Sequence, residues 1–245
     1  MKKSLLFLIL LPLALWSQQA IILCYHRFAP TVDSSMTTTN AHFEAELTWL
    51  LEHGYTIVPL RRVVDALLGR GTLPNKAVAI TADDGHRSVY SDMAPIVKKF
   101  KIPVTLFIYP SSISKSEHSM TWEQLAELKK SGLFDIQSHT YWSPNFKTEK
   151  RRLTPDAYRV FVDKQLLGSK KAIEAKLGGT VDLLAWPFGI YDTELQEAAK
   201  KAGYIMAFSI DRRPATPKEH PMAQPRYMIL DRDAIAGFIN IFTKQ

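Results

Sequence analysis

The adjacent carboxylates Asp83 and Asp84 are the residues most suggestive of chemistry, because they end an apolar run and are followed at once by Gly85. Successive residues of a strand point to opposite sides. At the end of a strand, one acid can therefore face a metal ion while its neighbour reaches a metal-bound water. An Asp-Asp-Gly turn is also an ordinary loop start or helix cap, so the pair alone fits either hydrolysis or a structural turn.

A second polar cluster, residues 137–145, follows an apolar run that ends at Ile136. It contains His139, which lies at the predicted end of a strand and could bind a metal ion, although a lone histidine is more often structural. Tyr141 and Trp142 follow it and could form the wall of a sugar-binding site. The cluster thus suggests a metal ligand beside a carbohydrate site.

A third turn, at residues 186–189, has the sequence Trp-Pro-Phe-Gly and follows another apolar run. Its structural interpretation is the packing of Trp186 and Phe188 around the stiff ring of Pro187. Its functional interpretation is that these three side chains contact a sugar substrate, together with the aromatic pair of the second cluster.

These clusters need a scaffold that gathers the ends of several strands. Apolar runs rich in β-branched and aromatic residues recur along the chain, and longer amphipathic stretches separate them, which is typical of repeated βα units. The predicted strands are residues 20–25, 56–59, 77–81, 104–109, 134–138, 183–186 and 205–210. We therefore predict a single α/β domain with about seven parallel strands.

Repeated βα units can form either an open doubly wound sheet or a barrel. An open sheet would usually carry a glycine-rich phosphate loop after its first strand. Residues 25–27 are instead Tyr-His-Arg, and the chain has only 11 glycines and neither a G-x-G-x-x-G nor a Walker sequence. The sequence favours a barrel, in which the chemistry lies at the carboxyl ends of the strands.

The first residues predict export. Lys2 and Lys3 precede the apolar run 5–16, which has the layout of a signal peptide and is shorter than the roughly 20 residues of a spanning helix. We expect a signal peptide over residues 1–19, one domain over residues 20–245, and a periplasmic or secreted protein with no stable membrane span after cleavage. The alternative is a buried helix or an uncleaved anchor.

Composition and charge limit the partners. The chain is 46% hydrophobic and 22% charged, as expected of a globular protein. Its single cysteine, Cys24, excludes an intramolecular disulfide and is expected to pack in a buried strand. Without Lys2 and Lys3, 29 basic residues face 24 acidic ones, a net charge of +5. This balance fits anionic partners or a merely solvated lysine excess, and the absence of a basic stripe argues against nucleic acid.

In this order and spacing, the clusters resemble the polysaccharide deacetylase family, carbohydrate esterase family four, over residues 21–226. Residues 81–85, Thr-Ala-Asp-Asp-Gly, match the family's T-F-D-D-G motif, and residues 187–189 match its proline-aromatic-glycine motif. Other segments that look like family segments are residues 25–27, 121–124 and 202–204. The resemblance implies a distorted (β/α) barrel and a hydrolase that removes N-acetyl groups with a divalent metal, commonly zinc and otherwise cobalt or nickel.

The same resemblance implies roles for individual residues. Asp83 would be the general base, and Asp84 and His139 would be metal ligands. A metal there would polarise the acetyl carbonyl and lower the pKa of the attacking water. The implied substrate contacts are Tyr141, Trp142, Trp186, Pro187 and Phe188.

Ser143 departs from the family pattern. The family's second motif is H-T-x-x-H, whereas residues 139–143 read His-Thr-Tyr-Trp-Ser. A neutral hydroxyl is a weak ligand for zinc, so we expect weak metal binding through Asp84 and His139. The candidates for a substitute ligand are His86 and His26.

Two other family residues are missing from their usual places. Ala185 stands where many members have an arginine, so no ion pair for Asp83 is evident. The family's late L-x-H motif supplies the general acid, but the only late histidine is His220, in an unrelated context. Asp211 and Arg226 are candidates to line the site, with no role assigned.

The leading interpretation is a metal-dependent deacetylase of N-acetylated sugars in an extracytoplasmic polysaccharide or peptidoglycan. The alternative is a catalytically impaired glycan-binding or scaffold protein that keeps the fold. Retention of Asp83 and Asp84 favours the enzyme, since an unused pair of adjacent carboxylates is electrostatically unfavourable. The loss of a histidine at Ser143 favours the alternative.

Overall fold

The computed structural model describes residues 18–231 and 234–243. The signal peptide expected over residues 1–19 lies outside the described residues, except for its last two. In the described part of the chain, no helix combines the length and apolar character needed to cross a membrane.

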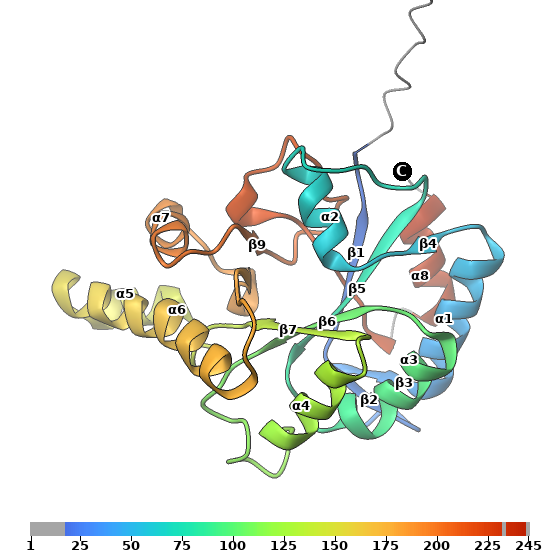
Figure 1. Ribbon diagram of the computed structural model, residues 1–245, viewed down its shortest axis with the longest axis horizontal. Helices are drawn as coiled ribbons and strands as arrows, with labels where there is room; N and C mark the ends of the chain where they lie inside the picture. The colour runs from blue at the N-terminus through green and yellow to red at the C-terminus, as the bar shows by residue number, and fades with distance from the viewer. Residues whose placement is uncertain (1–17, 232–233, 244–245) are drawn as a thin grey trace, which may run out of the picture.

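A curled parallel sheet forms the centre of the molecule, with strand order β10-β1-β5-β6-β7-β8-β9 (Figure 1). The strands are β1 (Ile21–Tyr25), β5 (Ala77–Asp84), β6 (Val104–Ile108), β7 (Phe134–Ser138), β8 (Leu183–Ala185), β9 (Met206–Phe208) and β10 (Tyr227–Met228). A further short strand, β4 (Thr56–Ile57), pairs with β5 off this path. The predicted α/β class with parallel strands is confirmed.

One segment connects the two edges of this sheet. Gln224 forms a bridge with Phe208 of β9, and Tyr227, three residues later, pairs with Leu23 of β1. The sheet therefore curls round on itself. Its two edges meet at an irregular junction, residues 225 and 226, which belong to no strand. This arrangement confirms the predicted distorted (β/α) barrel.

Three short strands were not predicted: β10, and the pair β2 (Arg27–Ala29) and β3 (Thr37–Thr39), which form a separate two-stranded sheet. Strands of two or three residues are too short to show a hydrophobic period. Strand β5 is longer than the predicted 77–81 and runs through both acids to Asp84.

Helices surround the sheet, most of them on its outside (Figure 1). They are α1 (Asn40–Glu52), α2 (Leu60–Leu67), α3 (Ala94–Phe100), α4 (Trp122–Lys130), α5 (Phe146–Arg152), α6 (Pro155–Leu177), α7 (Thr193–Lys201) and α8 (Ala234–Thr243). Single turns or short helices are η1 (Val89–Met93), η2 (Pro187–Gly189) and η3 (Pro221–Ala223). The start of α4 shows how local sequence sets these boundaries, because Thr121 and Gln124 form a reciprocal capping box.

The buried apolar side chains form two clusters, one on each face of the sheet. One joins alternate strand residues such as Leu23 and Ile80 to the outer helices. The other joins Ile22, Ala79 and their neighbours on the inner face to α2. Side chains alternate along a strand. Polar residues that lie an even number of positions after the inner-face apolar residues of β1 and β5 therefore also point to the inner face.

Candidate active site

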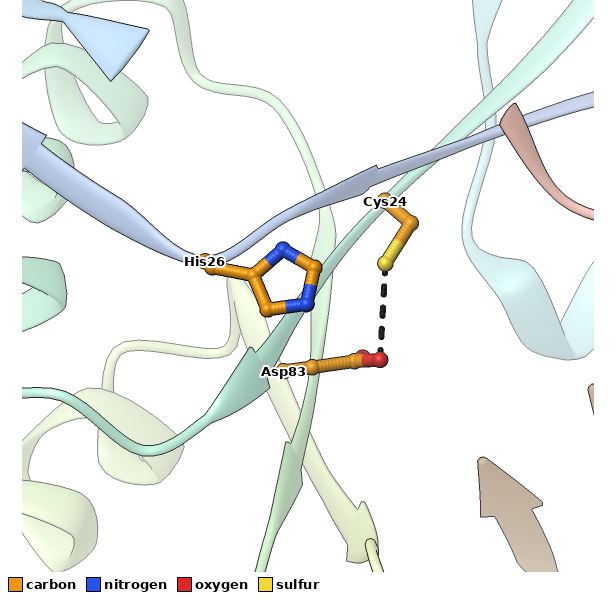
Figure 2. Close-up of side chains that lie close together, drawn as sticks. All are labelled: Cys24, His26 and Asp83. Atoms are coloured by element: carbon orange, nitrogen blue, oxygen red, sulfur yellow. Dashed lines mark hydrogen bonds between the residues drawn. The ribbon is translucent and has the colours of Figure 1, made fainter. Parts of the chain in front are cut away.

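Alternation along β1 and β5 places Cys24 and Asp83 beside one another. Cys24 has the same parity as the inner-face residue Ile22, and Asp83 has that of Ala79. The two strands are in parallel register, with Cys24 opposite Thr81. The Cys24 thiol donates a hydrogen bond of 3.4 Å to Asp83 Oδ2 (Figure 2). Both side chains lie in the interior of the barrel, and Cys24 is buried in a strand as predicted.

Asp84 lies in a different environment from its neighbour. It ends β5 with φ +72°, in the left-handed region that residues other than glycine rarely adopt. Whereas Asp83 is 2% exposed, the Asp84 side chain is 37% exposed. Strained backbone of this kind persists where the surrounding structure enforces it and clusters at functional sites. The turn therefore gives two adjacent acids different surroundings.

Arg226 holds Asp83 in a buried ion pair. Its Nη1 donates to Asp83 Oδ1 at 2.8 Å and its Nη2 donates to Oδ2 at 2.6 Å, with Arg226 itself 0% exposed. The guanidinium also donates to Thr81 Oγ1 and to the Ser209 carbonyl oxygen. Burial raises the pKa of Asp83, but the charge and hydrogen bonds of Arg226 outweigh it and hold that pKa well below its usual range. Asp83 is therefore ionised at neutral pH.

Asp83 does have an arginine partner, although no ion pair was evident from the sequence. Ala185 does occupy the family's arginine position, but Arg226 approaches the same carboxylate from the segment that precedes β10. The sequence offered Arg226 as a candidate to line the site, but no motif assigned it this role.

His139 presents a bare ring nitrogen to Asp84. The ring is buried, and Nδ1 lies 2.9 Å from the Ala185 carbonyl oxygen. Because a carbonyl oxygen only accepts, Nδ1 carries the proton and Nε2 keeps its lone pair in the neutral ring. Nε2 lies 3.5 Å from Asp84 Oδ1. Two ligands of a tetrahedral zinc ion, each about 2.0–2.1 Å from it, are about 3.4 Å apart, so this pair fits a shared metal.

Ser143 reaches the same pocket but provides only a hydroxyl. Its backbone is left-handed, with φ +58°, and its N–H donates to Thr140 Oγ1 at 3.2 Å. The structure thus places Ser143, where the resemblance implies a third ligand, in the same pocket as the Asp84–His139 pair.

One of the two proposed substitutes lies outside the pocket of this pair. His86 does not line the pocket: its Nδ1 lies 2.8 Å from Ser88 Oγ, and its ring stacks on His118. His220 is also outside the pocket, where its Nδ1 accepts a hydrogen bond from the Met222 N–H.

His26 does line the pocket, and its ring lies beside Asp83 (Figure 2). It is 8% exposed, and its Nδ1 is buried without a hydrogen-bond partner among the described residues. Burial lowers the pKa of His26, and the charges of Asp83 and Asp84 partly oppose this effect. The imidazole is therefore a neutral group at neutral pH that faces the two acids.

Cys24, His26 and Asp83 have ligand atoms within 4.8 Å of one another, close enough to consider as a metal site (Figure 2). Arg226 argues against this interpretation, because it already binds both Asp83 oxygens and places a positive charge beside them. A cation would have to displace or oppose this guanidinium. The Asp84–His139 pair lacks such a competitor in its contacts and fits a metal better.

The pocket that contains these groups has a volume of about 510 Å³. Its polar lining consists of His26, Asp83, Asp84, Tyr109, His139 and Ser143. Its apolar lining consists of Met36, Trp186, Phe188, Ile210 and Met228. The sequence did not identify Met36, Tyr109, Ile210 or Met228, which come from separate loops and strand ends without a recognisable motif.

The predicted sugar-binding aromatics differ in their surroundings. Trp186 is fully buried and its Nε1 donates to the Met222 carbonyl oxygen. Phe188 is 64% exposed at the pocket and has φ +57°. Trp142 is 37% exposed and lies next to Ser143 in the chain, but neither it nor Tyr141 lines the pocket. Pro187 is buried and positions Phe188 without lining the pocket.

Comparison with known proteins agrees with this geometry. The profile of the polysaccharide deacetylase family matches residues 70–207, which is more than half of the chain. The poly-beta-1,6-N-acetyl-D-glucosamine N-deacetylase of Staphylococcus aureus (strain MRSA252) is 26% identical over 199 residues, which cover 80% of this chain and 68% of that protein.

Solved structures share the fold. IcaB from Ammonifex degensii is 27% identical with a TM-score of 0.77, over 91% of this chain and 98% of that one. A de-N-acetylase from Aggregatibacter actinomycetemcomitans is 21% identical with a TM-score of 0.79, over 91% and 99%. The family match spans Asp83, Asp84 and His139. The chain therefore belongs to the polysaccharide deacetylase family, whose enzymes are hydrolases of amide bonds.

Proposed function

We propose that this chain removes acetyl groups from the N-acetylated sugars of an extracytoplasmic glycan, with a divalent metal as cofactor. One observation carries the proposal: an ionised, buried Asp83 lies in the same pocket as the Asp84–His139 pair, whose facing ligand atoms are 3.5 Å apart. The glycan is of the poly-N-acetylglucosamine or peptidoglycan type. The activity named for the Staphylococcus aureus relative supports the first of these.

Asp84 and His139 would hold the metal, with zinc the first candidate and cobalt or nickel the others. When bound, the metal supplies positive charge that polarises the acetyl carbonyl and lowers the pKa of the attacking water. Asp83 needs this help, because Arg226 makes it a weak base. A carboxylate of such low pKa accepts a proton efficiently only from water that has itself become more acidic.

His26 is placed to protonate the leaving amine. It is the pocket's remaining imidazole once His139 is assigned to the metal, among the residues that the structure describes. Because the pKa of His26 is lowered, its protonated ring is a stronger acid than an ordinary imidazolium. The proton that Asp83 accepts from the water passes to the neutral His26 ring and from there to the leaving nitrogen as the C–N bond breaks, so the amide bond is cleaved with its protons balanced.

Aromatic side chains would hold the sugar. The exposed ring of Phe188 can stack on a sugar face while Trp186 forms the apolar floor. Tyr141 and Trp142, which follow the metal-binding turn, would contact a neighbouring sugar of the chain. Pro187 would contribute by keeping Phe188 in place.

The glycan-binding alternative rests on Ser143. With a weak ligand at this position the protein has only two strong metal ligands, and its pocket can still bind sugar after the metal is lost. Acetate release separates the two functions. The substrates are β-1,6-linked and β-1,4-linked N-acetylglucosamine oligomers and peptidoglycan fragments, each without metal and with zinc, cobalt or nickel. Metal-dependent acetate release supports the enzyme. Saturable binding of an oligomer without acetate release under any metal supports the alternative.

A matched pair of variants shows whether the pocket is responsible. Asp83→Asn should abolish acetate release, whereas Asp163→Asn, which changes a carboxylate on the outer helix α6, should leave it unchanged. Equal loss in both variants would contradict the assignment of the activity to this pocket.

A further inference from the structure

The Cys24 thiol contacts the carboxylate that acts as base in the proposed reaction, yet no step of that reaction uses a thiol. Cys24 is 0% exposed and its Sγ donates to Asp83 Oδ2 at 3.4 Å (Figure 2). Nothing else in the described structure donates to this oxygen except Arg226. The contact therefore needs an explanation beyond packing.

The donors around Asp83 are distributed unequally between its two oxygens. Each carboxylate oxygen has about two acceptor sites. Oδ2 receives Arg226 Nη2 at 2.6 Å and the Cys24 thiol at 3.4 Å, so both of its sites are filled. Among the described residues, Oδ1 receives only Arg226 Nη1, at 2.8 Å. One acceptor site therefore stays open, and it belongs to Oδ1.

The thiol is suited to this contact because it stays protonated. Burial raises the pKa of Cys24 well above its ordinary value, the charge of Arg226 opposes this, and that of Asp83 adds to it. A neutral thiol is a donor, whereas a metal ligand is a thiolate. The same contact therefore argues for hydrogen bonding and against a metal site at Cys24, His26 and Asp83.

We propose that Cys24 is a positioning residue for the base: its S–H fills the second acceptor site of Asp83 Oδ2 and leaves Oδ1 as the oxygen that takes the proton of the attacking water. The inference rests on the proposed deacetylase function. A lone pair of the water oxygen forms the new bond to the acetyl carbon, the π pair of the carbonyl moves onto the carbonyl oxygen, and the proton that leaves the O–H bond of the water binds to the open site of Oδ1.

Infrared spectroscopy tests the hydrogen bond without reference to activity. Because Cys24 is the only cysteine of the chain, the single S–H stretching band belongs to it. We expect a band shifted to lower frequency than that of a free thiol in the wild type, a move to higher frequency in Asp83→Ala, and no move in Asp84→Ala. A band that stays in place in Asp83→Ala overturns the proposal, as does loss of the band when zinc is added.

Steady-state kinetics test the consequence for the reaction. Cys24→Ala should lower kcat about tenfold, at the lower end of the loss typical for a supporting partner, with KM changed less than about twofold. Cys24→Ser retains a donor and should recover much of the lost kcat. The control is Ile22→Val, which removes a methyl group from the same face of β1 without reaching Asp83 and should keep the wild-type kcat.

Three results overturn the assignment of Cys24: an unchanged kcat in Cys24→Ala, equal losses in Cys24→Ala and Cys24→Ser, or an equal loss in Ile22→Val. The failure of the proposed function looks different. A wild type that releases no acetate with any metal contradicts the function, and with it the catalytic part of this inference. A wild type that does release acetate, with an unmoved infrared band, contradicts Cys24 alone.

Discussion

Asp83 and Asp84 are joined by one peptide bond, but their partners make them chemically different. Asp83 faces the interior and is held by Arg226, which keeps it ionised and makes it a weak base. Asp84 turns outward through a left-handed backbone and faces the bare nitrogen of His139. Residues with separated environments of this kind can take the separate roles of base and metal ligand.

We expect Asp83→Asn to abolish acetate release while zinc binding persists, because Asp83 is not one of the proposed ligands. The same change removes the ionic partner of the buried Arg226. It should therefore lower the free energy of unfolding by about 3 to 5 kcal/mol. Acetate assays, zinc titration calorimetry and urea unfolding measure the three effects.

Asp84→Asn is the matched control, since it alters the adjacent carboxylate. It should lose both acetate release and zinc binding, with a smaller change in stability because Asp84 is partly exposed. Wild-type activity in Asp83→Asn would remove Asp83 from the mechanism. Wild-type zinc affinity in Asp84→Asn would remove Asp84 from the metal site.

Ser143→His should tighten zinc binding by at least about 10 to 100-fold. Loss of a metal ligand weakens metal binding at least as much as loss of a residue that hydrogen-bonds to a ligand. The left-handed backbone of Ser143, with φ +58°, accepts histidine more readily than most residues. Calorimetry on the wild type, Ser143→His and Ser143→Ala measures the effect, with the alanine variant as control. Equal affinities in all three would show that position 143 is not the missing ligand.

At the scale of secondary structure elements, β1 contributes to the site through one face and to the outer core through the other. Cys24 and His26 lie toward Asp83, whereas Tyr25 points out toward α1. There its hydroxyl donates to Glu46 Oε2 at 2.8 Å, and Glu46 is only 3% exposed. A buried acid thus lies directly behind the strand that supports the base.

The buried Glu46 predicts a dependence of stability on pH. Burial raises its pKa from 4.5 to about 8, against the opposing hydrogen bond from Tyr25. Between these two values the folded protein keeps a proton that the unfolded chain releases, so stability falls as pH rises. Glu46→Gln should remove this dependence and become more stable than the wild type by up to about 1.4 kcal/mol for each pH unit within the window.

Urea unfolding of the wild type and Glu46→Gln at pH 5 and pH 8 measures this difference. Glu44→Gln is the control, because Glu44 lies on the same helix and its side chain is 40% exposed. A difference between wild type and Glu46→Gln that is the same at both pH values would contradict the raised pKa of Glu46.

At the scale of the whole molecule, the short segment from Gln224 to β10 connects the two edges of the curled sheet and delivers Arg226 to its centre. Closure of the barrel and ionisation of Asp83 therefore depend on the same few residues. The pocket then opens where the strands end, as expected for this class of fold.

Export is also a property of the whole molecule. The charged start and the short apolar run predict that the mature chain begins between residues 17 and 21 and is recovered outside the cytoplasm. N-terminal sequencing after osmotic shock tests this, and Leu8→Arg, which interrupts the apolar run, should retain the chain in the cytoplasm. A soluble cytoplasmic pool with an intact Met1 in the wild type would refute the prediction.

The sequence alone was sufficient for the fold class, the main parallel strands and the acids at the end of β5. These features are encoded locally, because hydrophobic alternation and the position of a turn depend on residues close together in the chain. The order of the three clusters was enough to indicate the family, and the replacement of a histidine by Ser143 could be seen without coordinates.

Only the tertiary structure decided which distant side chains meet. Arg226 pairs with Asp83 across 143 positions of sequence, and Cys24 reaches the same carboxylate from another strand. His26 entered the pocket while His86 and His220 did not. The physical reason is that these contacts depend on how the sheet curls and on which strands become neighbours, and strand periodicity contains no information about either.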